Sequence, residues 1–202
     1  MRFMRIMRSP AVAAALLLTL FGSDSIASNI LANPGFETGS LSPWVNSLDF
    51  CSGCTWSVTN TDAHAGGFSA VAHGNRLLTQ AFGGIDTALI TEASLWLKMP
   101  DSGIAAVRFD YSDSSFEENP VDVGPTWAQF DVTAFLHAGK QLVGFGVFGC
   151  SGCAGNSATF ADDFVLDVVG QRVPMPATFS MLAMGAAGLG ILRLKRRLGR
   201  RQ

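Results

Sequence analysis

The sequence predicts an all-β protein whose central region folds as a β-sandwich, and three observations support this. Short runs of alternating apolar and polar residues recur from Asn29 to Val169. Glycine, proline or asparagine separates most of these runs, as tight turns between strands require. A sustained helical period is missing from this region, although Ala134–Leu136 is a candidate for a single helical turn. Short strands at this spacing are typical of sandwiches.

The expected strands follow one another closely along the chain. A run such as 105–111 illustrates the pattern, because Val107, Phe109 and Tyr111 alternate with Arg108 and Asp110. Successive side chains of a strand point to opposite faces, so one face is apolar and the other polar. The runs, in order, are Asn29–Leu31, Thr55–Thr59, Phe68–Ala72, Arg76–Phe82, Ala93–Met99, Ala105–Tyr111, Trp127–Val132, Leu142–Phe148 and Thr159–Val169.

Residues 1–27 have the three parts of a secretory signal peptide. Arg2, Arg5 and Arg8 precede an apolar run from Ala11 to Leu20, and small residues then lead to Ala27. A basic start, a short apolar run and a small-residue cleavage site are the features that signal peptidase recognises. The apolar run is too short to cross a membrane as an anchor. We therefore expect cleavage after Ala27 and export of the chain from Ser28 onward.

Residues 173–202 have a different three-part pattern. Val173, Pro174, Met175 and Pro176 form a proline motif, and residues 177–192 carry no charge. A helix of that length spans about 24 Å, short for a bilayer core of about 30 Å, and long basic side chains at its end would reach the headgroups. Cations after the span stay on the cytoplasmic side. The basic tail consists of Arg193, Lys195, Arg196, Arg197, Arg200 and Arg201.

This C-terminal pattern resembles the PEP-CTERM sorting signal, with Met175 where the namesake motif has glutamate. The resemblance implies an exosortase-type processing enzyme as partner, removal of the tail, and transit through the inner membrane to the cell surface or extracellular matrix. The alternative is a C-terminal anchor that is never cut. Either way, the central domain would lie outside the cytoplasm.

The central domain, residues 28–172, is strongly acidic. It holds five basic and fifteen acidic residues, a net charge of −10, although the whole chain carries only −2. Its length suits one domain with a core of its own. Such a charge argues against nucleic acid and anionic lipid as partners, because both are negatively charged. It suits an extracellular module or one that binds divalent cations.

Two motifs mark the ends of this domain: Asn33–Gly39 followed by Trp44, and Phe160–Leu166 with its Asp162–Asp163 pair. Both resemble motifs of jelly-roll carbohydrate-binding modules of the galactose-binding-like class. The resemblance implies a jelly-roll sandwich whose first and last strands are neighbours. It also implies a structural calcium ion held by Glu37 and by Asp162 or Asp163. Consecutive strand residues face opposite ways, so we expect one aspartate of the pair to reach the ion, with backbone carbonyls completing its shell. The alternative is that all three are solvated loop carboxylates.

Four cysteines form two identical tetrapeptides, 51–54 and 150–153, and there are no others. Neighbouring first and last strands would place both at one end of the sandwich. Export to an oxidising compartment favours disulfides, and four cysteines allow three pairings. Four thiolates on one zinc ion are the alternative. The residues concerned are Cys51, Cys54, Cys150 and Cys153.

Alternation also predicts a ligand face. If the apolar residues of 93–99 and 105–111 line the core, the other face carries Trp96, Lys98, Arg108 and Asp110. An aromatic ring flanked by charges is a common platform for a sugar. The alternative is that Trp96 packs beneath a loop and that the charges are solvated.

Recognisable catalytic motifs are missing from the sequence, which has neither a nucleophile elbow nor a metal-binding histidine pair. We therefore expect a noncatalytic surface or matrix protein that is exported and sorted. A carbohydrate-binding module for an exopolysaccharide is the first alternative, and a glycoside hydrolase is the second.

Overall fold

The computed structural model describes residues 27–49, 53–149 and 158–170, and these contain strands and two single 3-10 turns. The strands are β1 (Ser28–Asn29), β2 (Val45–Asp49), β3 (Trp56–Thr59), β4 (Ser69–His73), β5 (Arg76–Asp86), β6 (Ile90–Lys98), β7 (Gly103–Tyr111), β8 (Phe116–Val123), β9 (Ala128–Asp131), β10 (Gln141–Phe148) and β11 (Ala158–Val168). The two turns are η1 (Thr87–Leu89) and η2 (Thr133–Phe135).

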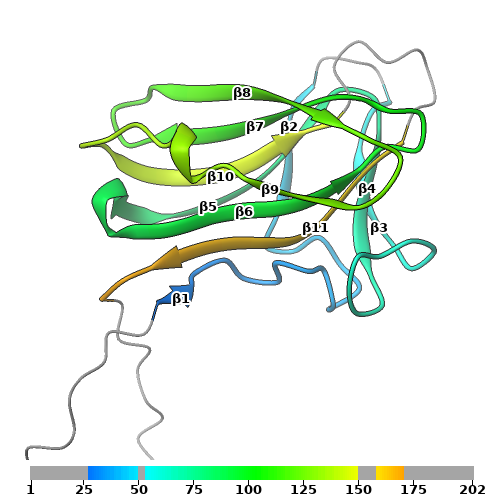
Figure 1. Ribbon diagram of the computed structural model, residues 1–202, viewed down its shortest axis with the longest axis horizontal. Helices are drawn as coiled ribbons and strands as arrows, with labels where there is room; N and C mark the ends of the chain where they lie inside the picture. The colour runs from blue at the N-terminus through cyan, green and yellow to red at the C-terminus, as the bar shows by residue number, and fades with distance from the viewer. Residues whose placement is uncertain (1–26, 50–52, 150–157, 171–202) are drawn as a thin grey trace, which may run out of the picture.

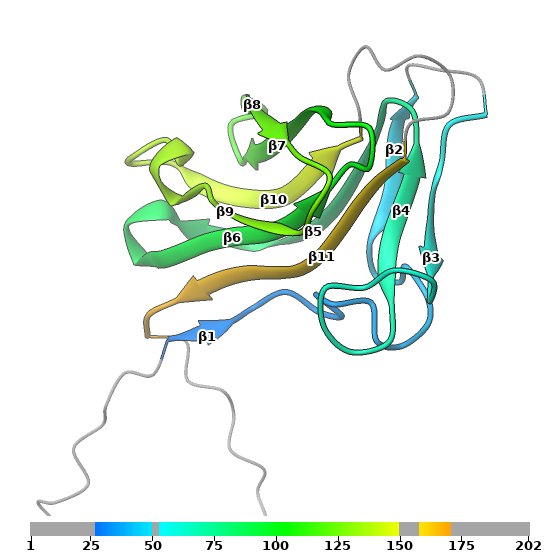
Figure 2. The same ribbon diagram turned by 45° about the vertical axis from the view of Figure 1, so that its right-hand side comes forward.

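The strands form two antiparallel sheets that pack face to face (Figures 1 and 2). In sheet A the order is β3-β4-β11-β6-β9, with β1 also pairing with β11. In sheet B the order is β2-β5-β10-β7-β8. The all-β sandwich expected from the alternating runs is confirmed.

The first and last strands of the domain are antiparallel neighbours. Ser28 of β1 lies opposite Val168 of β11, and Asn29 lies opposite Asp167. The Asn29 side chain strengthens this pairing, since its amide nitrogen donates to the Phe164 carbonyl and its oxygen accepts from the Leu166 N–H. The two ends of the domain therefore leave it side by side, as Figure 1 shows at its lower left.

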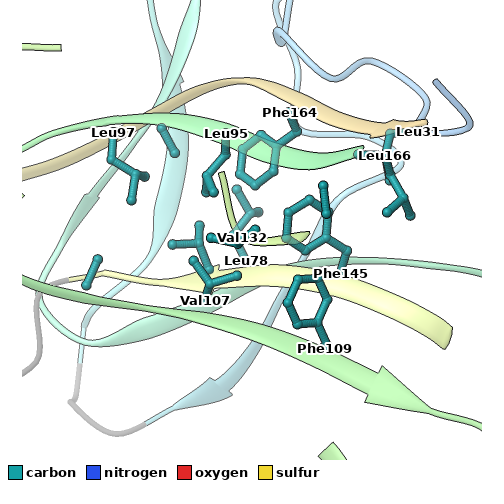
Figure 3. Packing of buried hydrophobic residues seen from close by; sticks show 14 of the residues in the cluster. Leu31, Leu78, Leu95, Leu97, Val107, Phe109, Val132, Phe145, Phe164 and Leu166 are labelled. Carbon is teal, nitrogen blue, oxygen red and sulfur yellow. The ribbon is translucent and has the colours of Figure 1, made fainter. Parts of the chain in front are cut away.

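The core lies between the inner faces of the two sheets (Figure 3). Leu95 and Leu97 of sheet A face Val107 and Phe109 of sheet B, and all four are fully buried. Phe145 of β10 stacks on Phe109, with their ring centroids 5.1 Å apart. Close packing of this kind makes large-to-small substitutions in the core cost about 2–5 kcal/mol.

An aromatic cluster joins the start of the domain to its last strand. The Trp44 ring lies 4.5 Å from the Phe164 ring and 5.8 Å from the Phe36 ring, centroid to centroid. The Trp44 indole nitrogen donates to the carbonyls of Ala32 and Asn33. This packing explains why the opening motif, 33–39, and the closing motif, 160–166, occur together in the sequence.

Two strands were not expected from the sequence, and both are edge strands of sheet B. The first is β2, a short strand that begins at the exposed Val45. The second is β8, in which only Val121 and Val123 are buried. Glu117, Glu118 and Pro120 are not residues typical of a strand, so its alternation is hard to see in the sequence. Charged residues and proline are tolerated at a sheet edge because one side of the strand makes no ladder bonds. The predicted helical turn appears as η2, one residue earlier than expected.

Within the described residues, no helix is long and apolar enough to cross a bilayer. The predicted signal peptide, residues 1–27, lies outside the described residues except for Ala27, and the predicted sorting segment, 173–202, lies wholly outside them.

Candidate functional site

The four residues of the predicted ligand face belong to two different faces. Trp96 and Lys98 lie in β6 of sheet A, whereas Arg108 and Asp110 lie in β7 of sheet B. The prediction of a single shared face is wrong, because the chain crosses from one sheet to the other between these strands. Both pairs still point away from the core, since the residues that alternate with them, such as Leu97 and Phe109, are buried between the sheets.

On sheet A, the Trp96 ring is covered by His64. This histidine comes from the 60–68 connection between β3 and β4, and its ring stacks on the indole with centroids 3.5 Å apart and planes 14° apart. Its backbone N–H donates to Asp162 Oδ2 at 2.9 Å, and its Nδ1 lies 2.7 Å from Asp163 Oδ2. Trp96 therefore packs beneath a loop, and the position where a sugar ring would stack is already taken.

Neighbouring side chains close this part of sheet A further. Lys98 forms an ion pair with Asp62, whose other carboxylate oxygen accepts from the Trp127 indole nitrogen at 3.0 Å. The Lys98 ammonium also lies 6.0 Å from the Phe160 ring centroid. These contacts hold the 60–68 connection against the sheet and leave its charges paired.

On sheet B, an exposed aromatic ring is held by charged neighbours. Phe116 of β8 is 55% exposed, the largest fraction among the large apolar side chains of the described residues. The Arg108 guanidinium carbon lies 4.0 Å from the centroid of its ring. Arg108 Nε donates to Asp110 Oδ1 at 2.8 Å, and its Nη1 donates to Glu118 Oε1 at 2.6 Å. Two carboxylates therefore fix the guanidinium that stacks on the ring.

The strand beside this group presents no side chains to it. Gly146 of β10 lies opposite Arg108, and Gly144 lies opposite Asp110. A Cβ atom at Gly144 would approach Asp110 Oδ2 to 3.1 Å, closer than side chains normally allow. Thr79 of β5 continues the Gly146 row, so small residues extend from Arg108 across the middle strand, β10, to β5. We call Arg108, Asp110, Phe116 and Glu118, with the two glycines, the sheet B face.

Two of the three predicted calcium ligands, Asp162 and Asp163, present carboxylate oxygens to Gly35, and Glu37 approaches it with its Cγ atom. A Cβ atom there would lie 2.9 Å from Asp163 Oδ1, 3.5 Å from Asp162 Oδ1 and 3.9 Å from Glu37 Cγ. The expectation that one aspartate alone can face this site is wrong. A bulge interrupts β11 after Asp162, and Asp163 has a φ of 43°, so both carboxylates turn toward the 60–68 connection.

Asp162 is better placed than Glu37 to bind a cation. Asp162 is fully buried, and burial together with the adjacent Asp163 raises the pKa of its carboxyl to about 6. A nearby cation would stabilise this buried charge. Glu37, in contrast, accepts from the backbone N–H groups of Gly67 and Phe68, and so serves as an anchor for the connection. The described residues contain no group of three acidic, histidine or cysteine side chains placed to hold a metal.

Of the four cysteines, Cys54 lies among the described residues and is disulfide-bonded. Cys51, Cys150 and Cys153 lie outside them, so the pairing stays a prediction. The described residues at or next to both tetrapeptides contact the same residue, Arg76. Arg76 Nη1 donates to the Cys54 carbonyl at 2.9 Å, while the Arg76 carbonyl accepts from the Gly149 N–H at 3.1 Å.

Sequence reasoning missed Phe116, Glu118 and His64. The first two lie in β8, a stretch that none of the expected strands covers, although Phe116, Glu118, Pro120 and Asp122 alternate with Val121 and Val123. That alternation was the available signal. Nothing local to His64 indicates that it covers Trp96, because the contact joins a loop to a strand far along the chain.

Comparison with known proteins shows where this fold occurs. No protein-family model matches the sequence, and no curated protein matches it. The CBM22-1 xylan-binding domain of Paenibacillus barcinonensis Xyn10C matches with a TM-score of 0.50 and 13% identity, covering 75% of this chain and 100% of that domain. The tandem CBM22-1–CBM22-2 structure from the same protein matches with a TM-score of 0.50 and 14% identity, covering 77% of this chain and 49% of that one.

A different kind of protein matches as well. The enzymatically active domain of tailspike protein 4 from bacteriophage CBA120 gives a TM-score of 0.53 at 14% identity, covering 70% of this chain. This chain corresponds to about a fifth, 21%, of that one. Identities this low establish fold and not activity. The central domain therefore has the jelly-roll β-sandwich fold that carbohydrate-binding modules share.

Proposed function

We propose that this protein is an exported, noncatalytic carbohydrate-binding module whose ligand lies on the sheet B face. The observation that carries the proposal is the Phe116 ring, exposed yet held in place by Arg108, Asp110 and Glu118. Binding sites typically combine an apolar surface with a few well-placed polar groups that fix orientation. A sugar has the matching character, because its ring offers C–H groups and its rim offers hydroxyls.

The arrangement favours binding because little has to be ordered when a ligand arrives. The Arg108 side chain is 13% exposed and is fixed by two carboxylates before any ligand is present. A site ordered in advance loses less conformational entropy on binding. Gly144 and Gly146 leave the adjacent strand bare, so an extended chain of sugars would meet no side chain there.

The outer face of sheet A is a weaker candidate. His64 stacks on Trp96, and a ligand would have to displace it along with its contacts to Asp162 and Asp163. Each lost hydrogen bond to a charged group costs about 1.5–3 kcal/mol. Phe116 can be reached without such a loss.

The proposal is tested by matched phenylalanine substitutions. Binding of soluble polysaccharides, xylan among them because the matched CBM22 domain is xylan-binding, is measured by affinity electrophoresis and calorimetry. Phe116→Ala should weaken binding at least about tenfold, which corresponds to about 1.4 kcal/mol. Phe135→Ala is the control, since Phe135 is exposed in η2 and takes no part in the sheet B face. Equal affinity of the two variants and the parent for every bound glycan would refute the proposal.

We also propose sorting by an exosortase-type enzyme. Support comes from the sequence: the proline motif 173–176, the uncharged stretch 177–192 and the basic tail. Signal peptidase, acting after Ala27, would be the second processing partner. Processing at either terminus would occur next to one end of the domain, because β1 and β11 pair there.

A structural calcium ion is a further proposal, supported by the buried Asp162 beside Asp163. The two aspartates would supply carboxylate oxygens, and backbone carbonyls would complete a shell of six to eight. Glu37 would act from outside the shell by holding Gly67 and Phe68. Zinc held by all four cysteine thiolates is the alternative to disulfides that the sequence raised, but a disulfide-bonded Cys54 has no thiolate to offer such a site.

A further inference from the structure

Among the described residues of the sheet B face, the Arg108 N–H groups donate hydrogen bonds to one oxygen of each neighbouring carboxylate, and the second oxygen of each carboxylate stays free to accept. The Arg108 guanidinium donates to Asp110 Oδ1 through Nε, with Nη2 also 2.8 Å from that oxygen, and to Glu118 Oε1 through Nη1. Its flat side is occupied by the Phe116 ring. The strongest donor of the face is therefore largely committed within the protein.

The second oxygen of each carboxylate is in a different position. Asp110 Oδ2 and Glu118 Oε2 accept no hydrogen bond from the described residues. Asp110 Oδ2 leans over Gly144, where no side chain screens it. An ionised carboxylate accepts and cannot donate. These two free carboxylate oxygens can therefore bind a ligand group that donates a hydrogen bond.

The charge of the face has the same implication. One guanidinium lies between two carboxylates, and Asp122 points outward from the same edge strand. The domain around it, residues 28–172, has a net charge of −10. A sugar carboxylate would be repelled by this negative charge, and the one cation among the described residues of the face, Arg108, is already paired with Asp110 and Glu118.

We infer that the sheet B face binds glycans without acidic groups and favours sugars in which an ammonium replaces a hydroxyl. The inference rests on the proposed function and names its ligand class. A hydroxyl donates one hydrogen bond to Asp110 Oδ2 or Glu118 Oε2, whereas an ammonium donates up to three and adds charge attraction. A uronic acid adds repulsion and has to break the Arg108 pairs to find a partner.

The test uses oligosaccharide pairs that differ at one group. Cello-oligosaccharides and chitosan oligosaccharides differ at C2, where a hydroxyl becomes an ammonium. Manno-oligosaccharides and mannurono-oligosaccharides, both β-1,4-linked, differ at C6, where a hydroxymethyl becomes a carboxylate. Calorimetry at low salt should show the amino form binding about fivefold more tightly than its partner, the size expected of one exposed ion pair. The gain should shrink at about 0.3 M salt, and the uronate form should bind at least about fivefold more weakly than its partner.

Two charge variants separate the local effect from the net charge. Glu118→Gln keeps an acceptor oxygen but removes one charge from the face, and should lower the ratio of amino to neutral affinity well below fivefold, with Asp110 retaining part of the preference. Asp101→Asn removes the same charge from the exposed turn after β6 and should leave the ratio near fivefold. A ratio that falls equally in both variants would overturn the assignment to this face.

The outcomes also separate this inference from the proposed function. If neutral oligosaccharides bind in a Phe116-dependent way while amino forms bind no tighter, or uronate forms bind as well, the ligand class is wrong and the module stands. If no oligosaccharide binds in a Phe116-dependent way, the proposed function fails and the ligand class fails with it. Tighter amino binding that depends on both Phe116 and Glu118 supports both.

Discussion

Replacing Asp162 by asparagine should change how the stability of the domain depends on pH. Asp162 is fully buried, and burial and Asp163 raise the pKa of its carboxyl from 3.8 to about 6. Between these two values the folded protein holds a proton that the unfolded chain has released. Stability from this group is therefore greatest at low pH and falls as pH rises from about 4 to 6.

The size of the effect depends on the shift. Each unit of pKa corresponds to about 1.4 kcal/mol, so the shift of about two units predicts that Asp162 lowers the free energy of unfolding by about 3 kcal/mol between pH 4 and pH 7. Asp162→Asn loses this pH-dependent part. It also faces the N–H groups of His64 and Asp163 with an amide that has one acceptor oxygen, a pH-independent cost of about 1–3 kcal/mol.

The assay is urea unfolding with a calcium chelator present, from pH 4 to pH 7.5, for the parent and for two variants. The free energy of unfolding of Asp162→Asn, relative to that of the parent, should rise by about 3 kcal/mol between pH 4 and pH 7. Asp167→Asn, on the same strand but outside the cluster around Gly35, is the control for removing one carboxylate. A difference that stays constant across the pH range would refute the reasoning. Added calcium should stabilise the parent at pH 7 but not Asp162→Asn if the ion binds there.

Three further predictions concern the sheet B face, the C-terminal segment and the cysteines. Gly144→Ala should weaken glycan binding several-fold with little loss of stability, because its Cβ would press on Asp110 Oδ2. Gly83→Ala is the control, because its Cβ would meet nothing within 4 Å, and it should change neither binding nor stability. Calorimetry measures the binding and melting curves measure the stability, and unchanged binding in Gly144→Ala would contradict the placement of Asp110. Replacing Pro174 and Pro176 should leave the full-length protein in the inner membrane with its tail intact, as fractionation and intact mass would show; normal maturation would contradict exosortase sorting. Native exported protein should contain no free thiols and no stoichiometric zinc, and mass spectrometry of unreduced peptides should reveal the pairing; four free thiols, or one zinc ion per chain, would contradict the disulfide assignment.

The sequence predicted the sandwich because its strong strands alternate clearly. Residues 105–111 are an example, with Val107, Phe109 and Tyr111 all buried. It missed β8 because an edge strand tolerates Glu117, Glu118 and Pro120, whose propensities argue against a strand. Propensity reports local preference, and the pairing of β8 with β7 outweighs it.

The candidate site was harder to predict than the fold. Alternation correctly gave the outward direction of Trp96 and of Arg108, but it cannot tell which sheet a strand joins. Whether the two residues share a face depends on the order of strands in the sheets, which the sequence does not show, and the structure places them in different sheets. The prediction that only one aspartate of the Asp162–Asp163 pair faces the site was wrong for a similar reason. Alternation assumes a regular strand, and the pair lies at a bulge.

The position of β11 determines how the domain would respond to mechanical load. A pull at Val168 acts along a strand that is paired with β6 over most of its length on one side, and with β4 and β1 on the other. Antiparallel ladder bonds lie perpendicular to the strands, so such a force shears many of them together instead of opening them one at a time. A pull at Ser28, in contrast, first meets the two residue pairs that join β1 to β11. A domain tethered by its C-terminal side would therefore resist drag on a bound polymer better than one tethered by its N-terminal side.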